Sequence, residues 1–139
     1  MKYVSDRRAS VDFVQFPNET VELRGGDCDD LSVCFSSLLE SIGIQTAFID
    51  YKPVNGIGHV TLLINTNLLP NESGLITINE RKYFVRKNYS AKEEVWIPIE
   101  ITSLNSFDEA WNLGSTKFYS EGIDNFGLSN GKVEIVDVY

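Results

Sequence analysis

The chain has 139 residues, which is the length of one ordinary domain. A hydrophobic fraction of 42% and a charged fraction of 23% allow a buried core, which excludes a disordered chain, a disulfide-rich mini-protein and a coiled-coil rod. Asp and Glu number 20 against 12 Lys and Arg, so the formal net charge is −8. Because nucleic acids and anionic membranes repel this charge, we expect neither as a partner.

The first strong element signal is a helix that begins at Cys28. Apolar residues recur at helical spacing and predict one buried face: Leu31, Cys34, Phe35, Leu38, Leu39 and Ile42. Aspartates at positions 27, 29 and 30 suit the positive end of the helix dipole, and Gly43 is a natural stop. Cys28 therefore falls at the start of the buried face. The first 24 residues of the chain are expected to be irregular.

Strand patterns follow this helix. Residues 44–50 and 58–64 predict two strands joined by a loop with Pro53, Asn55 and Gly56. Residues 75–78 and 83–85 flank Asn79-Glu80 and predict a hairpin. Residues 95–102 alternate, with valine and isoleucine on one face and Trp96, Pro98, Glu100 and Thr102 on the other. This pattern places Glu100 within a strand.

The end of the chain returns to a helix and a strand. Ser106-Phe107-Asp108-Glu109 is a capping-box signature and predicts a helix that carries Ala110, Trp111 and Leu113. Residues 132–138 predict the last strand. This order of elements predicts an α+β fold with a mainly antiparallel sheet.

No repeat, linker or membrane-length apolar stretch divides the chain, and its first eight residues lack the apolar core of a secretory signal. We therefore expect a single domain over residues 1–139, with the alternative that it was cut from a larger protein with neighbouring domains. Its compartment is not indicated by the sequence.

Two cysteines and one histidine limit the metal chemistry of the chain. Cys28 and Cys34, six residues apart on one helix, point to different faces, so no disulfide is expected between them. With His59 they match no zinc pattern, and Leu31 and Ser32 stand where a calcium loop needs other residues. We expect no metal and no cofactor, and we interpret Cys34 as a core residue.

Cys28, His59 and Glu100 together offer the parts of a thiol nucleophile site. The start of a helix favours the reactive thiolate form of a cysteine. A neighbouring imidazole takes the thiol proton and returns it to the leaving group. A carboxylate on the other ring nitrogen fixes the orientation of the ring.

Four sequence motifs then carry a family resemblance. Residues 24–32, Arg-Gly-Gly-Asp-Cys-Asp-Asp-Leu-Ser, resemble the nucleophile motif of the transglutaminase-like superfamily, especially its bacterial cysteine-proteinase-like branch. Residues 38–49 resemble the helix and strand behind that cysteine, and residues 58–60 are similar to the histidine motif. Residues 96–102 resemble the third motif, in which an acidic residue precedes a threonine by two positions. The resemblance runs from about residue 12 to about residue 119 and extends over the helix after residue 106.

The resemblance implies a papain-like, transglutaminase-type core with the Cys28 helix packed on an antiparallel sheet that supplies His59 and Glu100. In that family pattern Cys28 is the nucleophile, His59 the general base and acid, and Glu100 the orienting carboxylate. Better-known transglutaminases carry Asp at the third position, so Glu100 must reach with one more methylene. Their oxyanion-stabilising aromatic residue has no match; the Cys28 backbone N–H is one expected donor, with Gln15 or Tyr3 as the second.

The implied reaction is acyl transfer on an amide of a peptide or protein substrate, through a thioester intermediate. Transfer to water, by a peptidase or amidase, is favoured, and transfer to a lysine amine would make a cross-linking transglutaminase. The rival hypothesis is a catalytically silent domain that binds peptide or protein in the same groove. An accessory domain of a multidomain protein is a third.

Overall fold

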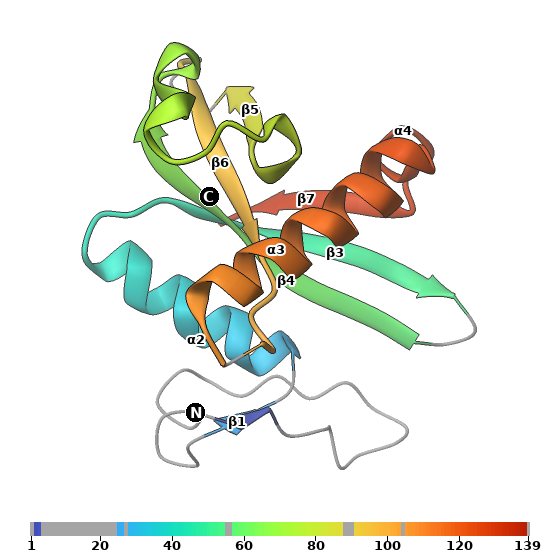
Figure 1. Ribbon diagram of the computed structural model, residues 1–139. Helices are drawn as coiled ribbons and strands as arrows, with labels where there is room; N and C mark the ends of the chain where they lie inside the picture. The colour runs from blue at the N-terminus through green and yellow to red at the C-terminus, as the bar shows by residue number, and fades with distance from the viewer. Residues whose placement is uncertain are drawn as a thin grey trace.

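The computed structural model describes residues 2–3, 25–26, 28–54, 57–87, 91–103 and 105–138. Its strands are β1 (Lys2–Tyr3), β2 (Gly25–Gly26), β3 (Thr46–Val54), β4 (Ile57–Leu68), β5 (Phe84–Lys87), β6 (Glu93–Ile99) and β7 (Val133–Asp137). Its helices are α2 (Cys28–Ser41), α3 (Phe107–Lys117), α4 (Gly127–Asn130) and the short η1 (Pro70–Leu75), η2 (Glu80–Lys82) and η3 (Phe118–Asp124). The mixture is the expected α+β fold (Figure 1).

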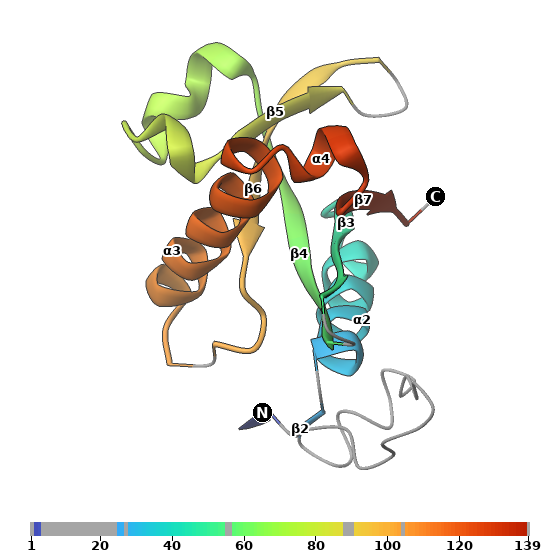
Figure 2. The same cartoon turned by 90° about the vertical axis from the view of Figure 1, so that its right-hand side faces the viewer.

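A curled five-stranded sheet is the centre of the fold. Its strand order is β5-β6-β4-β3-β7, and all neighbouring pairs are antiparallel. β4 lies in the middle of the sheet, and Figure 2 shows it running between α2 and α3. A two-residue parallel pair, β1 with β2, is separate from this sheet.

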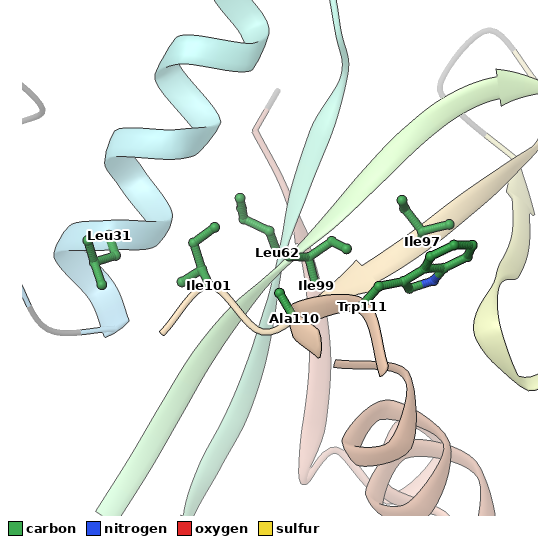
Figure 3. Packing of buried hydrophobic residues seen from close by; sticks show 7 residues of the cluster. All are labelled: Leu31, Leu62, Ile97, Ile99, Ile101, Ala110 and Trp111. Carbon is green, nitrogen blue, oxygen red and sulfur yellow. The ribbon is translucent and has the colours of Figure 1, made fainter. Parts of the chain in front are cut away.

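Alternating residues of the sheet contribute side chains to two hydrophobic clusters. The first joins the two long helices to the sheet through Leu31, Leu62, Ile97, Ile99, Ile101, Ala110 and Trp111 (Figure 3). The second packs Phe118, at the start of η3, against Ala47, Ile49, Tyr51, Leu63, Trp96 and Val133. Because β6 contributes to both, it is buried on both faces. Strand alternation predicted one apolar face of β6, whereas the core uses both.

Helix α2 begins and ends where the sequence predicts. Gly43 takes a left-handed φ of 86°, and the Ile44 N–H donates to the Leu39 carbonyl at 3.0 Å, which closes the C-terminus. The predicted buried face is wrong at its distal end, because Leu38 is 50% exposed and Ile42 is 72% exposed. Two serines face the sheet instead, as described for the site below.

The hairpin predicted over residues 75–85 is wrong. Its first half forms no strand: η1 ends at Leu75, and Ile78 is 97% exposed. Local side-chain bonds favour short helical turns here, since Glu72 accepts from the Leu69 N–H at 2.8 Å and Asn79 accepts from the Arg81 N–H at 2.9 Å. Only Phe84–Lys87 enters the sheet, where it pairs with β6.

The last part of the chain agrees with its sequence pattern. Ser106 caps α3 by accepting from the Glu109 N–H at 3.1 Å. β7 forms the sheet edge beside β3. The stretch predicted to be irregular lies, apart from residues 2–3, outside the described residues. None of the helices in the described ranges combines the length and apolar character that a membrane span needs.

Candidate active site

The first turn of α2 carries Cys28, and polar contacts fix this helix on the sheet. The Ser32 hydroxyl, fully buried, donates to the Val60 carbonyl at 3.3 Å, next to His59 in the chain. Two turns further on, Ser36 and Thr46 share a hydrogen bond of 2.6 Å between their hydroxyls. Small hydroxyl side chains let the helix lie close to β4 and β3, and the start of the helix consequently lies at His59.

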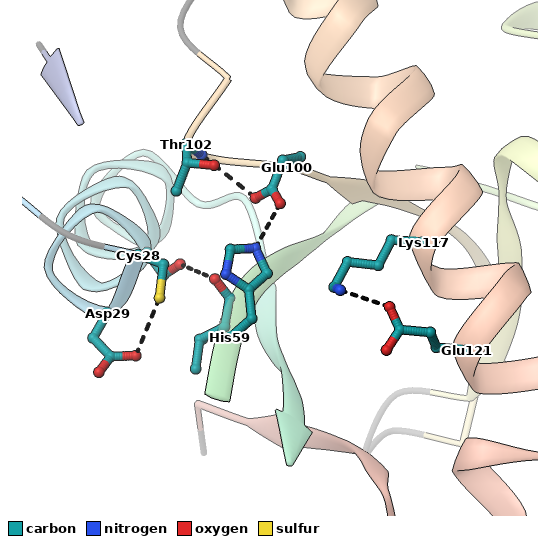
Figure 4. A network of polar contacts seen from close by, with 9 residues as sticks. Cys28, Asp29, His59, Glu100, Thr102, Lys117 and Glu121 are labelled. Carbon is teal, nitrogen blue, oxygen red and sulfur yellow. Dashed lines mark hydrogen bonds and ion pairs between the residues drawn. The ribbon is translucent and has the colours of Figure 1, made fainter. Parts of the chain in front are cut away.

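His59 is the third residue of β4 and lies between the other two candidate residues. Its Nε2 is 2.5 Å from Oε1 of Glu100, and the Cys28 side chain lies close enough to the ring to raise the pKa of the imidazole. Figure 4 draws the imidazole between Cys28 and Glu100, with the second ring nitrogen towards Cys28. The structure thus brings the three residues predicted from sequence together around one imidazole.

Glu100 follows directly after β6. The alternation of residues 95–102 predicted that Glu100 lies within the strand, and this prediction is wrong. Its backbone N–H donates to the Ala110 carbonyl at 2.9 Å, which ties this residue to α3. Its second carboxylate oxygen accepts from the Thr102 N–H at 3.5 Å, a long contact. β6 ends before Glu100 because the Glu100 N–H bonds to a carbonyl of α3 and not to a neighbouring strand.

Close packing of α3 on the end of β6 depends on Gly114. A Cβ at this position would lie 2.6 Å from the Pro98 carbonyl oxygen and 2.7 Å from the Glu100 nitrogen, far inside van der Waals contact. A glycine in a helix costs stability relative to alanine. Here the absence of a Cβ at Gly114 lets α3 lie close to the end of β6, and this close packing positions the Glu100 backbone.

The electrostatics of the group favour a charged imidazole. The hydrogen bond with Cys28 and then the one with Glu100 raise the pKa of His59 to about 9, although burial lowers it. The His59 side chain is 26% exposed and that of Glu100 is 14% exposed, so solvent screens this pair only in part. An imidazolium between a thiol and a carboxylate can pair with a thiolate and later donate its proton.

Neither cysteine forms a disulfide, and the two differ in their surroundings. Cys28 is half-buried, and its Sγ lies 3.8 Å from a carboxylate oxygen of the neighbouring Asp29. Cys34 is fully buried, and burial raises the pKa of its thiol. The prediction that Cys34 is a core residue is confirmed.

Three further residues beside His59 were not predicted from the sequence. Tyr51 is the direct cross-strand partner of His59, with ring centroids 6.2 Å apart. Lys117 lies over the Tyr51 ring at 4.6 Å and pairs with Glu121 at 2.6 Å. The register of β3 against β4 and the path of α3 bring them here, and neither can be derived from local sequence patterns.

The expected oxyanion donors are placed only in part. Gln15 lies outside the described residues, and of Tyr3 the structure describes the backbone, which pairs with Gly26 two residues before Cys28. Within the described ranges, His, Cys, Asp and Glu side chains form no group of three that could hold a metal ion.

Comparisons of the chain with known protein families, with curated proteins and with solved structures find no match. The resemblance to the transglutaminase-like superfamily therefore stays a prediction from sequence motifs.

Proposed function

We propose that this chain is a cysteine-dependent acyltransferase acting on amide bonds of a peptide or protein, with water as the favoured acceptor. The observation that carries the proposal is the Cys28–His59–Glu100 group, in which one imidazole is hydrogen-bonded to a carboxylate and lies beside a thiol. A helix packed on an antiparallel sheet is consistent with a papain-like, transglutaminase-type core, the finer fold that the sequence motifs imply.

The reaction follows from where the protons lie. His59 takes the proton of Cys28, and the thiolate sulfur bonds to the substrate carbonyl carbon. The carbon–nitrogen bond then breaks, His59 gives its proton to the leaving amine, and a thioester remains on Cys28. A water molecule, with His59 as base, releases the acid and restores the thiol. Glu100 keeps the ring oriented and stabilises its charged form throughout.

Acylation by p-nitrophenyl acetate tests the nucleophile without knowledge of the natural substrate. We expect a burst of about one nitrophenolate per protein and an acetyl thioester located at Cys28 by peptide mass mapping. Cys34→Ala should keep the burst and Cys28→Ala should lose it. A protein that shows no burst, or the same burst in Cys28→Ala, is not a cysteine acyltransferase, and the silent binding domain becomes the better account.

Whether the acyl group is transferred to water or to an amine is tested on the protein acylated at Cys28. Adding a primary amine in place of water separates the two reactions: a hydrolase releases free acid regardless of the amine, whereas a cross-linking transglutaminase transfers the acyl group to it. We expect mostly free acid. Predominant amide formation would assign the chain to the cross-linking class instead.

A further inference from the structure

A lysine–glutamate pair lies beside the proposed catalytic group and has no part in the reaction described above. Lys117 is the last residue of α3, and the chain continues directly into η3, a π-helix of the kind found frequently at functional sites. Figure 4 draws Cys28 on one side of the imidazole and the Lys117–Glu121 pair on the other.

The two contacts of Lys117 differ in how firmly they hold its ammonium group. Tyr51 is only 3% exposed, and a cation–π contact on a buried ring gains from the loss of water. Glu121 is half exposed in its side chain and pairs with Lys117 four residues away, an arrangement that contributes little to stability. The ammonium is therefore held by the ring, and the Glu121 carboxylate can exchange with another carboxylate.

Charge around the site gives this ammonium a specific use. Glu100 and Glu121 both act on Tyr51, and burial followed by Glu121 and Glu100 raises the pKa of Tyr51, so its phenol stays neutral. A substrate carboxylate arriving here would meet two like charges. Lys117 supplies the opposite charge that lets it bind.

The geometry sets how far such a carboxylate lies from the reacting bond. Lys117 Nζ is 4.6 Å from the Tyr51 centroid, which is 6.2 Å from the His59 centroid, so Nζ lies no further from the imidazole than these two separations combined. An extended peptide advances about 3.3–3.6 Å per residue. With Cys28 on the far side of the ring, this upper limit corresponds to about four residues or fewer.

We propose that Lys117 is a specificity-determining residue that binds a carboxylate of an acidic peptide substrate, two to four residues from the carbonyl attacked by Cys28. The Glu121 side chain occupies this position when no substrate is bound and is displaced by the substrate. This inference rests on the proposed function, because it places the substrate by its reaction with Cys28.

Matched peptidyl chloromethyl ketones test whether Lys117 binds a substrate carboxylate. A thiolate displaces the chloride of these compounds to form a stable thioether. Three pairs carry either aspartate or asparagine at two, three or four residues from the ketone, and the measured quantity is the second-order rate of Cys28 alkylation. We expect one aspartate probe to react about fivefold faster than its asparagine partner, the range of an exposed ion pair.

The variants separate the roles of the pair. Lys117→Met should abolish the aspartate preference and leave the asparagine rate unchanged, which also shows an intact site. Lys117→Arg should keep the preference, and Glu121→Gln should increase it by removing the competing carboxylate. Lys52→Met makes the same change in net charge at a lysine that pairs with Asp50 and Glu134, and it should keep the preference.

Two different failures are distinguishable. Equal rates for all aspartate and asparagine pairs, or a preference that persists in Lys117→Met, would overturn the role of Lys117 while leaving Cys28 a nucleophile. Absence of alkylation at Cys28 by every probe would overturn the proposed function and, with it, this inference.

Discussion

The two cysteines of α2 show how position on one helix decides what a thiol can do. Cys28 lies in the first turn, half-buried, beside an imidazole that a carboxylate holds from the other side. Cys34 lies in the middle of the helix, fully buried, where burial raises the pKa of its thiol. The same residue type is placed for chemistry at one position and fills the core at the other.

The largest expected effect is the difference in reactivity between these two thiols. At neutral pH we expect iodoacetamide to alkylate Cys28 at least about a hundredfold faster than Cys34, because only Cys28 can pair with an imidazolium and reach solvent. Peptide mapping over a time course measures both rates in one sample. Unfolding in guanidinium should remove the difference, and comparable rates in the folded protein would contradict the account.

Removing the charge of Glu100 should reduce the difference between the alkylation rates of Cys28 and Cys34. In Glu100→Gln the imidazolium loses the carboxylate that stabilises it, so the thiolate–imidazolium pair becomes less populated. We expect the alkylation rate of Cys28 at neutral pH to fall about tenfold and to recover at higher pH.

Glu93→Gln supplies the control for that change, since Glu93 is an exposed glutamate at the start of β6, the strand that Glu100 follows. Its alkylation profile should match that of the parent. If Glu100→Gln also overlaps with the parent, Glu100 has no part in the mechanism and a Cys28–His59 pair remains.

A smaller effect on the same site should come from Gly114→Ala. The added Cβ overlaps the backbone at Pro98 and Glu100, so α3 must move away from β6, at a cost of about 1–3 kcal/mol in unfolding free energy. Cys28 alkylation should slow by a few fold as Glu100 shifts, while Cys34 stays protected. Gly74→Ala, which meets nothing within 4 Å, is the control; equal unfolding free energies for the two variants would rule out the packing role.

Local patterns were sufficient to predict most of the elements. The helix from Cys28 to its Gly43 stop, the capped start of α3 at Ser106 and the β3–β4 pair were all predicted, because capping and periodicity act between near neighbours. The candidate residues Cys28, His59 and Glu100 came from motifs, and the structure places them together.

What the patterns missed depends on tertiary contacts. An apolar, hairpin-like run at residues 75–78 stays out of the sheet although β5 lies at the sheet edge, and the Lys82 carbonyl that follows it accepts from the Trp111 indole N–H of α3. Ser32 and Ser36 are buried in place of Leu38 and Ile42, since contact with β4 and β3 fixes the rotation of α2. Tyr51 meets His59 only through strand register, and Lys117 meets the Tyr51 ring only through the path of α3.

The most direct test of the central claim is a proton NMR titration of the imidazole, which is unambiguous because His59 is the one histidine of the chain. The account predicts a pKa for His59 near 9, unchanged in Cys34→Ala and lowered in both Cys28→Ala and Glu100→Gln. A pKa near the unperturbed value of about 6.5, or one that neither substitution lowers, would show that thiol, imidazole and carboxylate do not act as one group.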